Sequence, residues 1–438
     1  MKLSVFPEDD LVDVPRRILV EGAPARSRVT LTARTVRHGI PWLARATFLA
    51  DGEGVIDVST DAPVFGDYGR VDAMGLFWSQ RRDPGAAQTS APAIRSAPLI
   101  TTVDAEVEID IDDRNPAPAA SATVTQRFVT DGTTRHELDH DVLRGVLFTP
   151  PGDGPFPAVV ILAGSGGGTM EEAGALISSR GFQVLALAYF GYADLPVNIT
   201  GTPLEYLELG LKWVHAELNP LNGKVAVHGS SRGGELVFLL ASRYPHLVDA
   251  VVAVAPGAMI HGAQTGGGSA GWTAPTWTVN GQPLEHLWHD NRAVTYQPWT
   301  GDVPPDRHTS VYRDGLRDGR LAAASRIPIE KFHGPVLCVS GMDDRAWPAS
   351  LYSRMVMASL EDAGHRAERL HLDYPDAGHT CPVPNTPSTD IERIHPKNGV
   401  PFNVGGTPAA AAFAGADSFP QVSAFLSRAL RGECNGRN

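Results

Sequence analysis

Residues 225–238 read VAVHGSSRGGELVF, and this stretch decides the fold that we expect. An apolar run leads into two adjacent serines, and a second apolar run follows a pair of glycines. Residues 229–233 fit the pattern G-x-S-x-G with Ser231 at its centre. Between a strand and a helix, this pattern makes a sharp turn that projects the serine hydroxyl. Because the chain has 45 glycines, the pattern can arise by chance and needs support from its surroundings.

The surroundings alternate apolar, strand-like runs with helix-like runs. Near-continuous apolar strands separated by helices are typical of a mostly parallel sheet that helices cover on both faces. In the first helix-like run, Thr169 and Glu172 are placed for a capping box and Gly181 for a left-handed end. We expect strands at 158–164, 182–190, 224–229, 248–257 and 334–341, and helices at 169–181, 204–218 and 233–245.

The first third of the chain has a different pattern. In RVTLTARTV, at 28–36, the apolar Val29, Leu31 and Ala33 alternate with polar residues, and VDAEVEIDID at 103–112 alternates more strictly. A period of two indicates a sheet with one solvated face. We therefore predict an antiparallel β-sandwich over residues 1–135, with a structural role, followed by an α/β domain over residues 136–438.

A serine nucleophile of this kind needs a histidine as base and an acid to orient it. The strand-like run GPVLCVSG is followed by Asp343 and Asp344, and a later strand-like run, RLHLDY, is followed by a loop that carries His379. The order serine, acid, histidine is that of an α/β-hydrolase. We predict Ser231, Asp344 and His379 as the catalytic residues and keep Asp343 as the alternative acid.

The stretch LAGSGGGTM, at 162–170, lies between an expected strand and an expected helix. Backbone N–H groups there can converge on a developing negative charge. We predict an oxyanion hole from the N–H of Arg232 together with that of Ser165 or Gly166. A phosphate-binding loop is the alternative, but the stretch lacks the G-K-[ST] ending of a P-loop and the complete dinucleotide fingerprint.

Together these stretches resemble the family of acyl-CoA thioesterases and bile acid-CoA:amino acid N-acyltransferases. The resemblance spans nearly the whole chain and implies a β-sandwich followed by an α/β-hydrolase domain, with Ser231, Asp344 and His379 as the triad. The acyltransferase branch has cysteine at the nucleophile position and the thioesterases have serine, so Ser231 favours hydrolysis. The stretches are MGLFWS (74–79), GVLFTPPGDGPFPAVVILAGSGGG (145–168), GFQVLALAYFGYADLP (181–196), HGSSRGGELVFLLAS (228–242), VSGMDDRAWPAS (339–350) and AGHTCPVPNTP (377–387).

The implied substrate is a small-molecule acyl thioester, linked to coenzyme A or to a carrier protein, with no cofactor and no metal. An acyltransferase, a carboxylesterase or a peptidase would use the same triad, because the triad fixes acyl transfer and not the leaving group. The segment 261–292 contains Trp272, Trp277 and Trp288, which could line an acyl channel or anchor a loop.

One motif points to a different chemistry. His136 and His140 lie in HELDH, which matches the zinc-binding pattern H-E-x-x-H. That pattern needs a helix, and the extended run VLRGVLFTPP follows almost at once, so we favour a strand or linker here.

Composition narrows the remaining possibilities. The net charge of −12 disfavours a nucleic-acid-binding protein, since phosphate neutralisation needs a basic face. An anionic substrate must then meet local arginines, for which Arg232, Arg292 and Arg307 are candidates. Three cysteines and the absence of a long apolar run predict a cytoplasmic protein without a membrane span or a disulfide framework.

Overall fold

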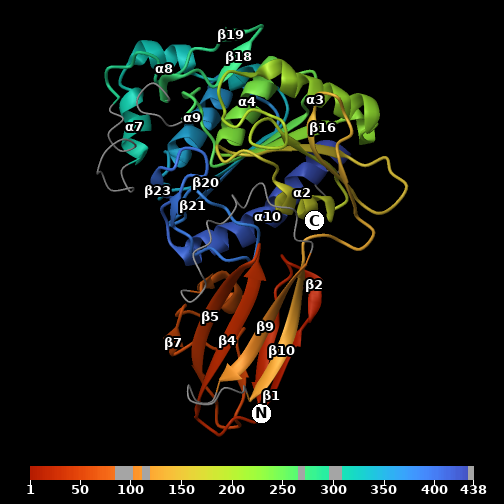
Figure 1. Cartoon of the computed structure of the whole chain (residues 1–438), viewed down its shortest axis with the longest axis vertical. Coiled ribbons are helices and arrows are strands. Elements are labelled where there is room, and N and C mark those ends of the chain that lie inside the picture. The colour runs from red at the N-terminus through yellow and green to blue at the C-terminus, as the bar shows by residue number, and fades with distance from the viewer. Residues whose placement is uncertain (84–101, 111–118, 265–271, 295–307, 433–438) are drawn as a thin grey trace.

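Two groups of β-sheets form the molecule, and the N-terminal group lies at one end of it (Figure 1). The computed structural model describes residues 1–83, 102–110, 119–264, 272–294 and 308–432. Two sheets make up the N-terminal group, one with strand order β1-β3-β6 and one with order β2-β10-β9-β4-β5-β7, where β8 also pairs with β5. Their strands are β1 (Lys2–Phe6), β2 (Asp9–Leu11), β3 (Arg17–Glu21), β4 (Arg28–Arg37), β5 (Ile40–Leu49), β6 (Ile56–Asp57), β7 (Phe65–Gly66), β8 (Arg81–Arg82), β9 (Thr102–Asp110) and β10 (Ala120–Arg127).

These two sheets pack face to face, as the period of two predicts. Val29, Leu31 and Ala33 of β4 are buried in one core with Ile18 and Val20 of the smaller sheet. The short helix α1 (Gly75–Trp78) closes this core. The predicted sandwich is confirmed, with one exception to its antiparallel pairing, since β10 and β2 run parallel. Ile111 and Asp112, at the end of the second alternating stretch, lie outside the described residues.

The second group is dominated by one eight-stranded sheet of order β11-β12-β14-β13-β16-β17-β20-β21. Its first two pairings are antiparallel and all the others are parallel. The predicted mostly parallel sheet is therefore confirmed, and the predicted strands all lie in it. The strands are β11 (Thr134–Glu137), β12 (Arg144–Thr149), β13 (Ala158–Leu162), β14 (Gln183–Ala188), β16 (Val225–Ser230), β17 (Ala250–Val254), β20 (Val336–Gly341) and β21 (Arg369–Tyr374).

Helices cover both faces of this sheet. One face packs against α3 (Leu204–Glu217), α4 (Arg232–Arg243) and α9 (Ala349–Asp362). The other face packs against α2 (Glu171–Ser178) and α10 (Pro408–Arg431). Although α10 has 24 residues, no helix within the described ranges is apolar enough over a sufficient length to cross a membrane.

The predicted capping box of α2 is wrong. The helix begins at Glu171, and its N-cap is Met170, which makes no side-chain capping bond. Thr169 instead donates from its hydroxyl to the Glu171 carboxylate at 3.2 Å, and Glu172 lies 3.4 Å from His38 of the N-terminal sheets. A contact within the same turn has replaced the cap for Thr169, and a contact with the distant His38 has replaced it for Glu172. The left-handed conformation predicted for Gly181 is confirmed, at φ +84°.

The chain passes from the N-terminal sheets to the eight-stranded sheet over residues 128–133, so the division proposed after residue 135 lies inside β11.

Smaller elements lie between β14 and α3, between β17 and β20, and between β21 and α10. The smaller elements are the strands β15 (Thr202–Pro203), β18 (Trp277–Val279) and β19 (Gln282–Pro283), the helices α7 (His308–Gly315) and α8 (Gly319–Ser325), and the hairpin strands β22 (Glu392–Ile394) and β23 (Pro401–Asn403).

A buried chain of hydrogen bonds joins the two sheet groups. The Arg37 guanidinium donates to the side-chain oxygen of Gln126 at 2.8 Å, and the Gln126 amide donates to the carbonyl oxygen of Asn385 at 3.2 Å. The Asn385 side chain returns to the carbonyl oxygen of Val12 at 2.9 Å. Asn385 belongs to the loop after β21, so the N-terminal sheets hold this loop directly.

Candidate active site

The predicted turn forms at the carboxyl end of β16. Ser231 lies between the last residue of β16 and the first residue of α4, with φ 58° and ψ −117°. Positive φ is uncommon for a residue with a side chain and costs on the order of 1–3 kcal/mol. The Ser231 N–H donates to the carbonyl oxygen of Val254 at 2.8 Å, and its own carbonyl accepts from Glu235 at 3.1 Å. Strand and helix together hold the strained residue.

Two glycines make this turn possible. A Cβ added to Gly229 would lie 2.1 Å from the carbonyl oxygen of Gly233. A Cβ added to Gly233 would lie 2.3 Å from the carbonyl oxygen of Leu162, at the end of β13. The requirement for small residues beside Ser231 therefore follows from backbone approach on both sides of the turn.

The structure brings Ser231, His379 and Asp344 together in one line of hydrogen bonds. His379 Nε2 lies 2.9 Å from Ser231 Oγ, and His379 Nδ1 lies 2.7 Å from Asp344 Oδ2. The Asp344 carboxylate accepts the hydrogen bond that His379 donates from Nδ1. This leaves Nε2 unprotonated and able to accept the serine proton. These side chains come from the ends of three parallel strands, where an open α/β sheet places its binding crevice.

The two neighbouring aspartates have different environments. Asp344 is buried and also accepts from the N–H groups of Ala346 at 2.9 Å and Trp347 at 3.1 Å. Burial raises the pKa of the Asp344 carboxyl, although its bond with His379 opposes this. Asp343 is only half-buried, forms an ion pair with Arg345 and accepts from the N–H of Gly406 at 3.0 Å. The geometry therefore supports Asp344 and not Asp343 as the acid.

The loop after β13 lies against the same turn. Leu162 is paired with Gly229, and both Ser165 and Arg232 line the pocket that contains Ser231 and His379. Gly166 does not line it. The following helix α2 carries Glu171 and Glu172 in its first turn. Two carboxylates at the start of this helix oppose the binding of an anionic phosphate there.

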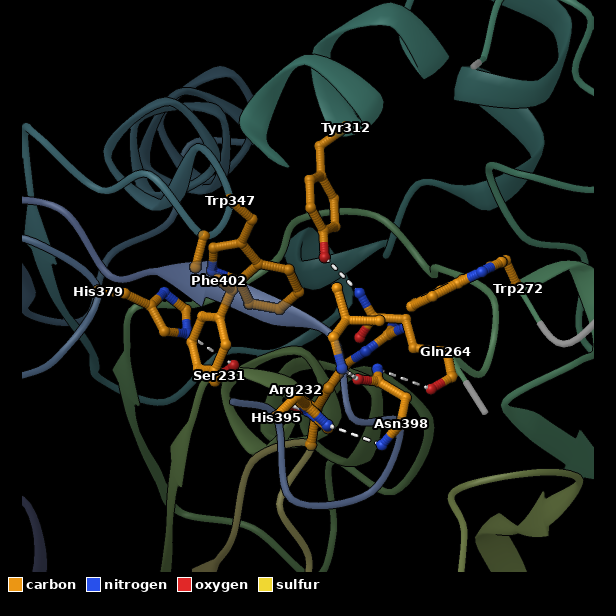
Figure 2. A pocket seen from close by; sticks show the side chains of 13 residues that line it. Ser231, Arg232, Gln264, Trp272, Tyr312, Trp347, His379, His395, Asn398 and Phe402 are labelled. Carbon is orange, nitrogen blue, oxygen red and sulfur yellow. Dashed lines mark hydrogen bonds between the residues drawn. The ribbon is translucent and has the colours of Figure 1, made fainter. Parts of the chain in front are cut away.

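The pocket has walls that sequence reasoning missed (Figure 2). Gln264, Trp272 and Tyr312 lie on the side away from His379, whereas His395 and Asn398 come from the β22–β23 hairpin. The dipeptide Asn398-Gly399 is a strong hairpin signal between two short extended runs, and it could have revealed this element. The complete lining is Ser165, Ser231, Arg232, Gln264, Trp272, Tyr312, Ala346, Trp347, His379, His395, Asn398, Val400 and Phe402.

A buried ionic cluster lies behind the nucleophile. The Arg232 guanidinium donates to Glu235 Oε2 at 2.9 Å, and His261 Nδ1 lies 2.9 Å from the same oxygen. Although burial favours the neutral acid, the Arg232 charge and the His261 bond hold the pKa of Glu235 below its usual value. Arg232 is only 1% exposed and its guanidinium is paired with Glu235, which argues against its predicted role in attracting an anionic substrate. Arg292 is exposed, and Arg307 lies outside the described residues.

The three tryptophans divide between the two roles considered for them. Trp272 lines the pocket. Trp277 donates from its indole nitrogen to Glu235 at 2.8 Å, and Trp288 packs its ring 5.8 Å from the Arg232 guanidinium. Trp277 and Trp288 therefore anchor their segment to the buried ionic cluster.

The HELDH motif does not form a metal site. His136 and Glu137 lie in strand β11 with exposed side chains, and His140 Nδ1 accepts from the N–H groups of Val142 and Leu143 at 2.9 and 3.0 Å. Within the described ranges, no group of three or more His, Cys, Asp or Glu residues could hold a metal ion. The expected strand is confirmed and a zinc-binding helix is not formed.

Comparison with known families agrees with this architecture. Residues 202–432 match "BAAT / Acyl-CoA thioester hydrolase C terminal", and residues 13–140 match "Acyl-CoA thioester hydrolase/BAAT N-terminal region". The chain belongs to this family. The family resemblance inferred from the sequence is thereby confirmed.

Similar family members fall in both branches. Human mitochondrial acyl-coenzyme A thioesterase 2 is 29% identical, over 96% of this chain and 82% of its own length. Mouse acyl-coenzyme A amino acid N-acyltransferase 1 is 28% identical, over 98% of each chain. Among solved structures, the Pyrococcus horikoshii acylaminoacyl peptidase is 13% identical, covering 92% of this chain and 56% of its own, with a TM-score of 0.44.

Proposed function

We propose that this protein hydrolyses acyl thioesters, with acyl-coenzyme A or a carrier-bound acyl group as substrate, through an acyl ester on Ser231. The observation that carries the proposal is the line from Ser231 through His379 to Asp344, at 2.9 and 2.7 Å. Family membership supports the thioester as the bond cleaved, since relatives named as acyl-coenzyme A thioesterases match nearly the whole chain.

The reaction begins when Ser231 Oγ attacks the thioester carbonyl carbon while His379 Nε2 takes the hydroxyl proton. Asp344 stabilises the imidazolium that results. The N–H groups of Arg232 and Ser165 are proposed to donate to the tetrahedral oxyanion, because both residues line the pocket beside the nucleophile and the first N–H groups of a helix have no intrahelical acceptor. Collapse breaks the carbon–sulfur bond, and the thiol leaves with the proton from His379.

Deacylation repeats these steps with water. His379 takes a proton from water as the water oxygen attacks the acyl ester, and the same donors hold the second oxyanion. Collapse releases the carboxylic acid and returns the proton to Ser231. Each residue thus serves both half-reactions.

Transfer of the acyl group to an amine is the second candidate, because N-acyltransferases of the family match the chain equally well. The resemblance assigns serine to the hydrolases and cysteine to the transferases. An acyl-serine is an oxygen ester, which reacts less readily with amines than a thioester does, so water is the expected acceptor.

Mass spectrometry of the products separates these reactions. The protein is incubated with a panel of acyl-CoAs, p-nitrophenyl esters and peptides, with and without glycine or taurine. We expect free acid and coenzyme A from the acyl-CoAs, with little amide. A preference for oxygen esters or peptides, or amide in excess of acid at moderate amine concentration, would contradict the proposal.

Ser231→Cys sharpens the same test. A thiolate paired with His379 should still take up the acyl group, but water should remove it more slowly. The acyl-enzyme should therefore accumulate as an intact-mass increase, and added glycine or taurine should divert part of it to amide. Turnover at the wild-type rate without accumulation would argue against a covalent path through residue 231.

We also propose a cytoplasmic location, supported by the low cysteine content and by the unpaired thiols of Cys338 and Cys381. The net charge of −12 supports a small-molecule substrate over nucleic acid. The division into a supporting N-terminal domain and a catalytic domain is likewise proposed, with the sites of chemistry all in the second.

A further inference from the structure

A second serine–histidine pair lies in the pocket of the nucleophile. His395 Nε2 is 2.9 Å from Ser165 Oγ, although 230 residues separate them in the chain. Ser165 follows β13, and His395 lies on the turn between β22 and β23. Both line the pocket with Ser231 and His379, and Figure 2 shows the His395 ring beside Asn398 on the pocket wall.

The contacts of His395 decide which nitrogen carries its proton. The N–H groups of Lys397 and Asn398 point at His395 Nδ1, at 3.3 and 3.4 Å. Nδ1 must then offer a lone pair, and the neutral ring carries its hydrogen on Nε2. His395 therefore donates from Nε2 to Ser165 Oγ. The hydrogen of the Ser165 hydroxyl is not used in this contact.

The two pairs in the pocket consequently have opposite polarity. His379 has a carboxylate at Nδ1, so its Nε2 accepts a proton from Ser231. His395 has two N–H groups at Nδ1, so its Nε2 gives a hydrogen bond to Ser165. The first arrangement makes a nucleophile. The second makes a serine whose hydroxyl is polarised to donate, because a hydroxyl that accepts a bond becomes a stronger donor.

Backbone packing holds Ser165 close to the reacting centre. Leu162 pairs with Gly229, and a Cβ on Gly233 would lie 2.7 Å from the Ala163 carbonyl oxygen, two residues before Ser165. The hairpin that carries His395 is tied to the triad as well, since the His379 N–H donates to the Val404 carbonyl oxygen at 2.7 Å. One framework positions both histidines.

We propose that the Ser165 hydroxyl is an additional oxyanion donor in the acyl-transfer reaction, and that His395 is the positioning residue that orients it. The inference rests on the proposed acyl-serine chemistry. Ser165 would then act through two groups, its N–H and its hydroxyl. No covalent step at Ser165 is involved.

The first test separates turnover from binding. Ser165→Ala should lower kcat by about 10²-fold, the range for loss of one oxyanion donor, and leave KM within about threefold. Ser165→Thr, which keeps the hydroxyl, should restore most of the activity. Ser359→Ala is the matched control, because its hydroxyl only returns to the Met355 carbonyl oxygen within α9. Equal kcat values for Ser165→Ala and Ser359→Ala would overturn the proposal.

A double-mutant cycle tests the role of His395. His395→Ala should lower kcat by about as much as Ser165→Ala, and His395→Gln, whose amide can replace the Nε2–H donor, should retain more. Because His395 acts through Ser165, the double variant Ser165→Ala/His395→Ala should be no slower than the worse single variant. Additive losses would show that His395 has a separate structural effect and would overturn its assignment.

A third measurement stays informative if thioesters are not the substrate. Ser231 attacks the phosphorus of a fluorophosphonate and displaces fluoride, and negative charge grows on the phosphoryl oxygen in the five-coordinate transition state. The labelling rate should therefore fall in Ser165→Ala in parallel with kcat on p-nitrophenyl esters. Wild-type labelling without thioester turnover would refute the proposed substrate alone. Unchanged labelling in Ser165→Ala, or a label recovered on Ser165, would refute the donor role alone.

Discussion

The two sheet groups bury their apolar residues in different ways. Strand β4 buries mainly one face, so apolar and polar residues alternate over Val29–Ala33, whereas β13 is buried along its whole length because helices cover both sides. Only the second arrangement leaves the carboxyl ends of parallel strands as a shared edge, and Ser231, Asp344 and His379 follow β16, β20 and β21 there. The N-terminal sheets contribute through contacts with the loop after His379. We therefore propose that chemistry and support are divided between the groups.

The largest expected effect tests whether all chemistry lies at that edge. Ser231→Ala should lower kcat for thioester hydrolysis by about 10⁴- to 10⁶-fold, as loss of a triad nucleophile does. Coenzyme A release measures it, with Ser230→Ala as the control on the adjacent residue. Fluorophosphonate should label Ser231 in the wild type and in the control. A label on Ser230, or full activity without the Ser231 hydroxyl, would break the comparison.

The next effect concerns the acid. Asp344→Asn should lower kcat by about 10⁴-fold, because an amide supports the wrong tautomer of His379. Asp343→Asn should stay within a few-fold of the wild type, since Asp343 pairs with Arg345 at the surface. Steady-state kinetics on the two variants decide between them, and the reverse order would move the acid to residue 343.

Asp344→Asn should lower activity but should not lower stability. Burial raises the pKa of Asp344 above its ordinary 3.8, so the folded state binds this proton more tightly than the unfolded state. The contribution to stability is therefore lost as pH rises from 3.8 through the raised pKa. Asp344→Asn removes this loss, and its free energy of unfolding at pH 7, from urea titration, should equal or exceed that of the wild type. A clear decrease would contradict this.

A smaller effect should come from the N-terminal sheets. Gln126→Ala leaves the buried Arg37 and the Asn385 carbonyl oxygen without their partner and should cost about 1–3 kcal/mol of stability. It should also lower kcat by about tenfold, less than the 10² that a 1 Å misplacement can cost, because the loop after His379 loses a support.

The control for Gln126→Ala lies in the smaller sheet of the sandwich. Ile18→Val should cost about 0.5–1.5 kcal/mol from a core position in β3 and leave kcat unchanged. Urea unfolding and kcat of the folded variants are measured together. If both variants keep the wild-type kcat, the N-terminal sheets support folding alone and the comparison must be redrawn.

For the HELDH motif we expect no effect on turnover at all. Chelation, and separately His136→Ala, should leave turnover unchanged, because the HELDH residues lie in β11 and its following turn. Activity is measured after dialysis against chelator and after return of zinc. Loss on chelation with recovery on zinc addition would place chemistry at the junction of the two groups.

Local patterns were sufficient for most of the fold and for the chain order of the three side chains that the structure brings together, Ser231, Asp344 and His379. The turn at Ser231 and the acid after β20 each depend on residues adjacent in sequence, so periodicity and spacing could identify them. The burial of the Arg232 side chain could not be predicted in this way, because it depends on Glu235 and on tryptophans from a distant segment. His395 was missed for the same reason, since its partner Ser165 lies far away in the chain.

The hydrogen bond between Gln126 and Asn385 joins positions that are 259 residues apart. During synthesis at 5–20 residues per second, about 10–50 s pass between the emergence of these two residues. Over that time the N-terminal sheets can assemble, while Arg37 and Gln126 remain solvated at an unfinished surface. The contact between the two sheet groups therefore forms late in synthesis. It can form only after the segment that bears His379 has been made.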